Sequence, residues 1–297
     1  MERILASLPP DGRVAVVRLR SLGDCVLTTP ALDILKRCRP DLRVAVVVED
    51  RFRTVFQGNP DIEAILTPSL AQLRQWNPAL CLNLHGGTRS AWMTRLSGAR
   101  WRAGFGHYRA QFAYNVRIPR AQDILGVTRK VHTAEHLASA MFYLGAPIGE
   151  IPRAKLVAGP VGDPGTYAVI HAVAATPEKT WPSDRFVAVA AYLRSAGIEP
   201  VFIGAAADDL SAFQEYRTMQ GAQLAEVKAL LSRAALFVGN DSGPAHMAAA
   251  FGVPVVVFFG ASDPEIWGPW RTAGQILRLS ATAADAIDAL SRVRVAA

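Results

Sequence analysis

The chain is poor in cysteine and has no long hydrophobic run. Its three cysteines, Cys25, Cys38 and Cys81, follow no metal-binding spacing, so we expect reduced thiols rather than disulfides or a structural zinc site. The longest apolar stretch, around residues 253–260, is far shorter than the roughly 20 residues that a membrane-spanning helix needs. These absences predict a cytosolic protein without a transmembrane helix or a structural metal.

Two nucleotide-binding signatures are also absent. The loop after the first apolar run lacks the G-x-G-x-x-G pattern of dinucleotide-binding proteins, and the P-loop pattern G-x-x-x-x-G-K-[ST] occurs nowhere in the chain. Dehydrogenases and P-loop enzymes are therefore disfavoured.

Charge is divided unevenly along the 297 residues. Residues 1–155 carry 22 Lys and Arg against 12 Asp and Glu, a net +10, whereas residues 156–297 carry 10 against 13, a net −3. We expect the basic half to face an acidic partner, and an anionic membrane surface, a phosphorylated substrate or nucleic acid would each satisfy this asymmetry.

Short apolar runs alternate with amphipathic stretches, which is the βαβ rhythm of a parallel sheet. In the first half we expect strands at residues 14–19, 44–48 and 80–84 and a helix at 31–38. In the second half we expect strands at 167–171, 201–204 and 255–259, and a further strand that ends at Val238. The expected helices span 183–194, 245–251 and 283–293, and a polar helix begins at Asp208. The Gly- and Pro-rich segment 157–166 is typical of a linker.

These elements predict an α/β protein with two Rossmann-like domains, at residues 1–157 and 166–280, followed by a segment, 281–297, whose helix could cross back onto the first domain. Ligands bind such sheets beyond the carboxyl ends of the strands, so two facing domains would enclose a central cleft.

The segment Gly239–His246 places a carboxylate, a hydroxyl and an imidazole between a strand and an alanine-rich helix. Asp241 can accept hydrogen bonds from sugar hydroxyls, and His246 can donate to an oxygen. Ser242 or Gly243 opens the helix, whose first amides point toward an anion. One such residue would fit an ordinary capped turn, but the set favours a sugar or phosphate site.

The first apolar run ends in a loop that contains Gly23 and Asp24. Asp24 fits two roles equally well, a general base for a substrate hydroxyl or a cap for the next helix. Pro30 also leaves two alternatives: the helix begins at Pro30 with Thr29 as its cap, or it begins at Asp24 and bends at Pro30.

A third loop follows the strand at 167–171 and carries Lys179 before Trp181. A lysine there could meet a diphosphate as a point charge, although in isolation a surface lysine is the more common finding.

Taken together, several segments resemble glycosyltransferase family 9, the heptosyltransferases that build the inner core of lipopolysaccharide. The matching pieces, in chain order, are Arg18–Asp24 with Thr28–Pro30, a weaker echo at Gly86–Ser90, Arg95–Ala99 and Gly104–Phe105, then Lys179–Pro182, Gly239–His246, Gly252–Pro254 and Gly260–Pro264.

The resemblance implies the GT-B fold and an inverting, metal-independent transfer of heptose from an ADP-activated donor, without a cofactor. Asp24 would deprotonate the acceptor hydroxyl, Lys179 would neutralise the departing diphosphate, and Asp241 would hold the donor sugar. Ser242, Gly243 and His246 would hold the phosphates.

The donor's ribose is usually bound in this family by an acidic residue near the position of Gly204. Here Ala205–Ala207 precede Asp208 and Asp209, and we take Asp208 as the donor-binding candidate.

Basic and aromatic residues alternate between Arg89 and Arg109, which is most often a solvated helix face. With the resemblance, we expect Arg20, Arg89 and Arg95 to bind a phosphorylated, lipid-linked oligosaccharide, with peripheral contact to the cytoplasmic face of the inner membrane and no nucleic acid.

Two rival functions remain. A nucleotide-sugar epimerase on a similar two-domain frame would rearrange a donor without an acceptor. A non-catalytic binder of nucleic acid or anionic membrane would use the basic half alone, and the set of Asp24, Lys179 and Asp241 argues against it.

Overall fold

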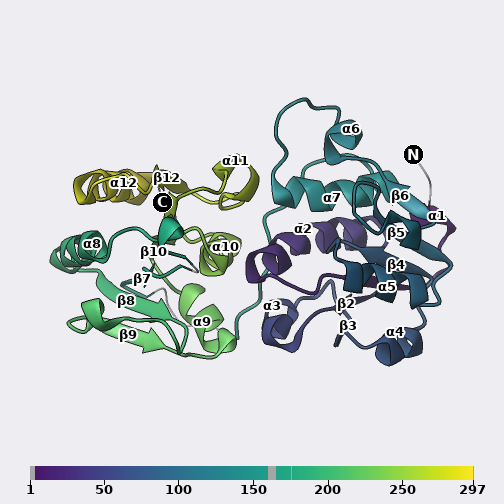
Figure 1. Cartoon of the computed structure of the whole chain (residues 1–297), viewed down its shortest axis with the longest axis horizontal. Coiled ribbons are helices and arrows are strands. Elements are labelled where there is room, and N and C mark those ends of the chain that lie inside the picture. Colours follow the sequence, from purple (N-terminus) through teal and green to yellow (C-terminus); the bar gives the residue numbers. More distant parts are fainter. Residues whose placement is uncertain (1–3, 160–164, 175, 297) are drawn as a thin grey trace. The chain divides into compact units, whose positions relative to one another are not determined.

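The chain folds into two compact units, Met1–Val157 and Ala158–Ala297. The structure is a computed structural model that describes residues 4–159, 165–174 and 176–296. Of the expected linker at 157–166, residues 160–164 lie outside the described residues. The predicted α/β class is confirmed in both units, and each unit is a six-stranded parallel sheet with helices around it (Figure 1).

Unit 1 has the strand order β3-β2-β1-β4-β5-β6. Its strands are β1 (Arg13–Val17), β2 (Arg43–Val47), β3 (Ala64–Leu66), β4 (Leu80–Asn83), β5 (Trp101–Phe105) and β6 (Val116–Ile118). The adjacent strands β1 and β2 share the sequence RVAVV, and the last four residues of each, all apolar, are buried. Runs of this kind, apolar at every position, suit a parallel sheet that is covered on both faces.

The helices of unit 1 are α1 (Ile4–Ser7), α2 (Leu22–Cys38), α3 (Arg53–Phe56), α4 (Leu70–Trp76), α5 (Thr88–Leu96), α6 (Ala121–Leu125) and α7 (Thr133–Leu144), with 3-10 turns η1 (Asp50–Phe52) and η2 (Gln111–Ala113). Among these, α2 and α7 pack closely against each other. Unit 1 is strongly basic, but its sheet and helices enclose an apolar core.

Helix α2 begins at Leu22, with Ser21 as its N-cap, and continues through Pro30. The alternative that placed the helix start at Pro30 is therefore wrong. Proline has no amide to donate to the carbonyl of Val26, four residues earlier. The hydroxyl of Thr29 donates to that carbonyl instead, at 2.8 Å, so the helix keeps its hydrogen bonding through the proline.

Unit 2 has the strand order β12-β11-β10-β7-β8-β9. Its strands are β7 (Tyr167–His171), β8 (Glu199–Gly204), β9 (Arg217–Gln220), β10 (Leu236–Asn240), β11 (Val255–Phe259) and β12 (Gly274–Arg278). Its helices are α8 (Ser183–Ser195), α9 (Leu224–Leu231), α10 (Gly243–Ala250), α11 (Pro264–Trp267) and α12 (Ala283–Ala296), with 3-10 turns η3 (Pro177–Lys179) and η4 (Ser211–Phe213).

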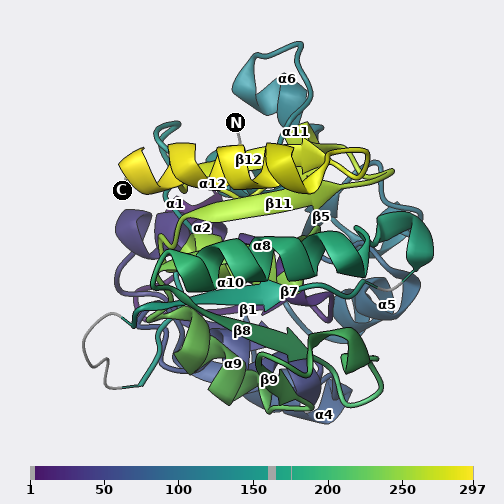
Figure 2. The same cartoon turned by 90° about the vertical axis from the view of Figure 1, so that its left-hand side faces the viewer.

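The last helix, α12, belongs to the core of unit 2. We expected that it could cross back onto the first domain, but it packs on α8, β11 and β12 (Figure 2). Its residues Ala286, Ala289 and Leu290 are fully buried in the cluster that also contains Trp181. The helix completes one face of this sheet because these small and apolar residues repeat at helical spacing.

The polar helix expected from Asp208 is wrong. The side chain of Asp208 accepts a hydrogen bond from the amide of Ala205, and that of Asp209 accepts one from the amide of Ser211. Such local side-chain bonds compete with helix formation, so the segment forms a turn and the short 3-10 turn η4.

Both sheets share one topology when the strands are numbered within each unit, because the order 3-2-1-4-5-6 describes both. The direction of strand progression reverses between the first and fourth strands, which are β1 and β4 in unit 1 and β7 and β10 in unit 2. Open α/β sheets bind ligands at this switch point, beyond the carboxyl ends of the strands.

Candidate active site

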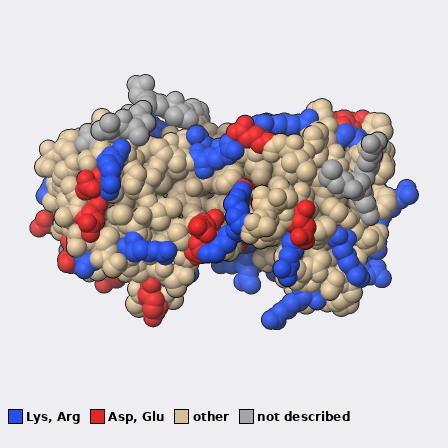
Figure 3. Space-filling view, turned by 90° about the horizontal axis from the view of Figure 1, so that it is seen from above, with Lys and Arg blue, Asp and Glu red and all other residues tan. Residues whose placement is uncertain are grey.

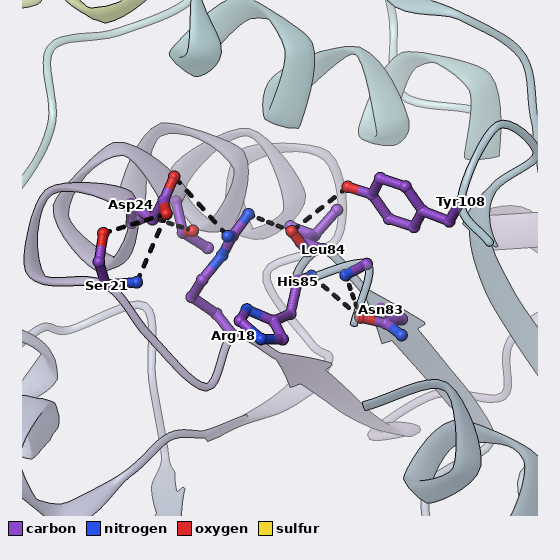
Figure 4. Close-up of polar contacts among 9 residues, drawn as sticks. Arg18, Ser21, Asp24, Asn83, Leu84, His85 and Tyr108 are labelled. Carbon is purple, nitrogen blue, oxygen red and sulfur yellow. Dashed lines mark hydrogen bonds and ion pairs between the residues drawn. The ribbon is translucent and has the colours of Figure 1, made fainter. Parts of the chain in front are cut away.

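In unit 1 the switch point carries Asp24, in the first turn of α2 (Figure 4). The hydroxyl of Ser21 donates to Asp24 Oδ2 at 3.1 Å, and the Ser21 amide approaches the same oxygen at 3.4 Å. Asp24 therefore completes a capping box with the N-cap residue Ser21. Its side chain remains 23% exposed, so the capping role leaves the carboxylate accessible to a ligand.

A buried arginine holds the other carboxylate oxygen. Arg18 follows β1 and is only 5% exposed; its Nη1 lies 3.8 Å from Asp24 Oδ1, and its Nη2 donates to the carbonyl of Leu84 after β4. Figure 4 shows this guanidinium joining the two loops of the switch point. Arg18 and Ser21 together fix the orientation of the Asp24 carboxylate.

The loop after β4 is organised by Asn83. Its Oδ1 accepts hydrogen bonds from the amides of His85 and Gly86, and its Nδ2 donates to Ser90 and Tyr114. Asn83 is fully buried and makes four hydrogen bonds, so the backbone that receives Arg18 is rigidly placed.

Gly86 in this loop has a φ of +79°, and a Cβ there would lie 2.8 Å from the ring of Tyr108. The position therefore requires glycine. Tyr108 in turn reaches the Leu84 carbonyl with its hydroxyl, at 3.5 Å, and burial raises its pKa to about 12.

His85 lies beside this group and was missed by the sequence analysis. Burial, followed by the positive charge of Arg18, lowers the pKa of His85, so its ring is neutral at pH 7. The only available signal was its position directly after an apolar strand.

In unit 2 the switch point carries Asp241, directly after β10. Asp241 Oδ2 accepts a hydrogen bond from the hydroxyl of Ser262 at 2.5 Å. Burial raises the pKa of Asp241, and the Ser262 hydrogen bond and the positive charge of Lys179 oppose that rise. The positive charge of Lys179 therefore acts on the Asp241 carboxylate.

Asn240 anchors the loop that carries Lys179. Its Oδ1 accepts from the amide of Trp181 at 2.9 Å, and its Nδ2 donates to the carbonyl of Ala172 at 3.0 Å. The Trp181 ring is fully buried and stacks on Phe258 at 3.9 Å. The loop is therefore fixed at both ends, and Lys179 stands exposed between them.

The start of α10 follows Asp241. Ser242 is the N-cap residue, and Gly243 and Pro244 are the first residues of the helix. The Ser242 hydroxyl is buried and has no hydrogen-bond partner among the described residues. His246 lies one turn further and is 6% exposed. This helix start offers a hydroxyl and backbone amides to an anion.

Asp208 and Asp209 differ in their surroundings. Asp208 lies near His171, at the end of β7. Burial lowers the pKa of His171 to about 4, and the negative charge of Asp208 opposes this shift. Asp209 is exposed and lines a pocket of about 470 Å³ with Trp181 and Ser211. Asp208 is therefore close to the end of a switch-point strand, β7.

The predicted acceptor arginines are separated by the structure. Arg20 is exposed in the Asp24 loop, and Arg89 is exposed in the first turn of α5, close to the end of β4. Arg95 lies in the last turn of α5, about 9 Å further along the helix axis. Arg95 is therefore not brought to the carboxyl edge of the sheet.

Among the described residues, no cluster of three or more His, Cys, Asp or Glu side chains could hold a metal ion. In the same part of the chain, no helix is both long and apolar enough to cross a membrane.

The sequence profile of Glycosyltransferase family 9 (heptosyltransferase) matches residues 70–294. This chain belongs to that family. The matched range includes Lys179 and the Gly239–His246 segment, and the Asp24 loop precedes it. Family membership makes the chain a glycosyltransferase and favours neither the epimerase nor the non-catalytic binder.

Curated relatives agree with the profile. Lipopolysaccharide heptosyltransferase 3 of Escherichia coli (strain K12) is 29% identical over 290 residues, which cover 85% of this chain and 83% of the relative. Lipopolysaccharide heptosyltransferase 1 of Pseudomonas aeruginosa is 26% identical over 290 residues, covering 87% of this chain and 81% of the relative.

Solved structures share the fold. The glycosyl transferase family 9 protein from Veillonella parvula has a TM-score of 0.86 at 22% identity, covering 96% of this chain and 98% of that one. The E. coli heptosyltransferase WaaC with ADP has a TM-score of 0.80 at 20% identity, and the match covers 95% of this chain and 99% of WaaC. The expected GT-B class of fold is confirmed by these neighbours.

Proposed function

We propose that this enzyme transfers a heptose from ADP-heptose to a phosphorylated, lipid-linked acceptor of the lipopolysaccharide core type. The observation that carries the proposal is the Asp24 carboxylate, oriented by Arg18 and Ser21 at the switch point of unit 1, in a chain of the heptosyltransferase family. The curated relatives, which are lipopolysaccharide heptosyltransferases, support the acceptor class. The structures of E. coli heptosyltransferase WaaC with ADP and with ADP-2-deoxy-2-fluoro heptose support the donor.

Unit 2 binds the donor in this proposal. Asp241 accepts hydrogen bonds from hydroxyls of the sugar, and the start of α10 receives the phosphates through the Ser242 hydroxyl, the Gly243 backbone and His246. Asp208 binds the ribose, because an acidic residue after the second strand of a Rossmann-like sheet is placed for that contact.

Lys179 stabilises the leaving group. Negative charge grows on the diphosphate as the bond to the anomeric carbon breaks, so a fixed ammonium group lowers the barrier by more than it stabilises the bound donor. The charge of Lys179 thereby takes the part that a metal ion plays in metal-dependent transfer, and the reaction proceeds without one.

Unit 1 supplies the base. Asp24 accepts the proton of the acceptor hydroxyl while that oxygen attacks the anomeric carbon and the diphosphate leaves from the opposite face, which inverts the configuration. Ser21 donates to one carboxylate oxygen and Arg18 pairs with the other, and the side chain stays 23% exposed. Arg20 and Arg89 bind phosphates of the acceptor at the same edge of the sheet.

Arg95 contributes differently, because it lies toward the other end of α5. We assign it to the phosphates of the lipid-linked acceptor further from the reacting hydroxyl, or of the leaflet that holds this acceptor. The enzyme then works in peripheral contact with the cytoplasmic face of the inner membrane.

A donor-specificity measurement tests the proposal. ADP should raise the melting temperature more than UDP or GDP at equal concentration, because a ligand that binds only the folded state stabilises it. ADP-heptose should then be consumed only when a phosphorylated lipid-linked acceptor is present, with one ADP released for each sugar transferred. Rearrangement of the donor without an acceptor would instead indicate an epimerase.

A further inference from the structure

One stretch of unit 1 contains no acidic residue. Residues 64–122 include eight arginines and no lysine, aspartate or glutamate. The arginines are Arg74, Arg89, Arg95, Arg100, Arg102, Arg109, Arg117 and Arg120. The segment contains β3, β4, β5 and β6, which are four of the six strands of the sheet. In Figure 3, which shows one face of the molecule, blue groups outnumber red ones over unit 1, on the right.

Large apolar side chains stand exposed on this same segment. Trp92 is 49% exposed, Leu96 40% and Phe112 58%. Trp92 and Leu96 are four residues apart on α5 and so share one face of the helix. The Phe112 ring, from η2, packs edge to face against Trp92 with ring centres 5.6 Å apart. We call these three residues the Trp92 patch.

Arginines surround the Trp92 patch. Arg89 and Arg95 lie three residues before and after Trp92 on α5, and both are exposed. Arg74, also exposed, donates through Nε to the carbonyl of Leu96 at 2.8 Å. An exposed apolar cluster with a rim of one charge is typical of an interaction surface rather than of a scattered surface residue.

We infer that the Trp92 patch docks unit 1 on a bilayer that contains anionic lipids. The aromatic rings enter the interfacial region of the bilayer, where Trp in particular is favoured, and the arginines contact lipid phosphates. The acid-free segment supplies the charge complementarity, because no carboxylate within residues 64–122 opposes the lipid charge. This inference rests on the proposed function, since it names the surface that brings the enzyme to a lipid-linked acceptor.

Two other occupants fit the surface less well. Single-stranded nucleic acid stacks its bases on open ring faces, whereas the edge-to-face contact at 68° covers part of the aromatic surface and Leu96 offers no ring. A second copy of the chain, paired by two-fold symmetry through this patch, would bring the same arginine rim against itself, which like-charge repulsion disfavours.

Vesicle binding of the full-length enzyme tests the inference. The wild type should co-sediment with vesicles of phosphatidylethanolamine and phosphatidylglycerol, bind pure phosphatidylcholine vesicles more weakly, and lose affinity as salt is raised. The double variant Trp92→Ala/Phe112→Ala should bind the anionic vesicles about tenfold or more weakly. Ile148→Ala, which removes a 54% exposed residue outside this segment, is the matched control and should bind like the wild type.

The activity of the same variant separates docking from catalysis. Trp92→Ala/Phe112→Ala should transfer heptose to a deacylated, water-soluble acceptor at the wild-type rate and lose rate only on acceptor held in vesicles. An equal loss on both acceptors would overturn the docking role. Wild-type binding to neutral and anionic vesicles alike, a wild-type dimer that the double variant dissolves, or RNA binding that anionic vesicles do not compete would each overturn it as well.

Vesicle binding needs no donor, so its failure and the failure of the proposed reaction are distinguishable. Enzyme that binds vesicles through the patch but transfers no heptose would refute the proposed function and leave the docking surface intact.

Discussion

The switch points of the two units have the same topology but hold their carboxylates in different electrostatic surroundings. Asp24 in unit 1 forms an ion pair with the buried guanidinium of Arg18. Asp241 in unit 2 instead accepts a hydrogen bond from the neutral hydroxyl of Ser262, and the positive charge of Lys179 acts to lower its pKa without a direct ion pair being formed between these two described residues. The pKa of Asp241 is raised by burial. The shared fold provides the location, and the neighbouring side chains decide what each carboxylate can do there.

The residue that ends the fourth strand of each unit is also the same but has different contacts. Both β4 and β10 end in a fully buried asparagine, Asn83 and Asn240. Asn83 fixes the loop that follows its own strand, but Asn240 fixes the loop after the first strand of unit 2, which carries Lys179. One residue type at one topological position thus supports two different loops.

The largest effect should come from removing the proposed base in unit 1. We expect Asp24→Asn to lower the transfer rate about 1000-fold, because the amide cannot accept the acceptor's proton, while ADP affinity stays unchanged. The measurement is single-turnover transfer together with an ADP titration. Asp123→Asn, at an exposed acid in the same unit, is the control. Transfer that survives in Asp24→Asn would end its assignment as the base.

In unit 2 the matching change is Lys179→Ala, which should lower turnover about 100-fold through loss of charge stabilisation on the diphosphate. Lys179→Arg keeps the charge and should retain more activity, although its geometry differs. Comparing kcat of the two variants with saturating donor checks this. Near-normal turnover in Lys179→Ala would remove the residue from the mechanism.

Replacing each buried asparagine by leucine should impair donor binding in one variant and acceptor binding in the other. Asn240→Leu should weaken ADP binding about tenfold and destabilise the protein by about 2 kcal/mol, because two loop backbone groups lose their partner. Asn83→Leu should spare ADP binding and raise the KM for the acceptor. Isothermal titration and acceptor kinetics on both variants check the division, which fails if Asn83→Leu impairs ADP binding as strongly as Asn240→Leu does.

A smaller effect should distinguish the two acids after β8. Asp208→Asn should weaken ADP binding about fivefold by removing a charged hydrogen bond to the ribose, whereas Asp209→Asn should change it less than about twofold. The two variants serve as controls for each other. The reverse ranking in an ADP titration would transfer the ribose contact to Asp209.

The smallest effect is on stability. Because the pKa of Asp241 is raised in the folded protein, the ionised carboxylate lowers stability above that pKa, and protonation relieves the cost as pH falls. Asp241→Asn should therefore melt at a higher temperature than the wild type at pH 8, and the difference should shrink toward pH 4. Melting curves at both values check this. A variant that melts lower at pH 8 would show that the carboxylate stabilises the fold.

The sequence was sufficient for much of the framework because the strands are continuous apolar runs between turn residues. The strands at 167–171 and 255–259 were predicted with their observed bounds. Of the two roles left open for Asp24, the capping role is observed, since Asp24 lies three positions after the N-cap Ser21 and closes a capping box. Its carboxylate stays 23% exposed, so the role of general base remains a proposal that the capping contact does not block.

The errors and omissions have physical causes. The helix expected from Asp208 gave way to hydrogen bonds between side chain and backbone. Arg18, Asn240 and Ser262 were assigned no role because their partners, Leu84, Trp181 and Asp241, are distant in sequence and meet them only through the sheet topology.

The central claim is that the switch point of unit 2 holds the nucleotide diphosphate. Hydrogen exchange of the full-length enzyme with and without ADP tests it most directly. The account predicts that ADP slows exchange at the backbone amides of residues 177–181 and 242–246, and that Asp241→Ala and Asp24→Asn leave this pattern in place. Saturating ADP that leaves both segments unprotected, while binding is independently confirmed, would contradict it.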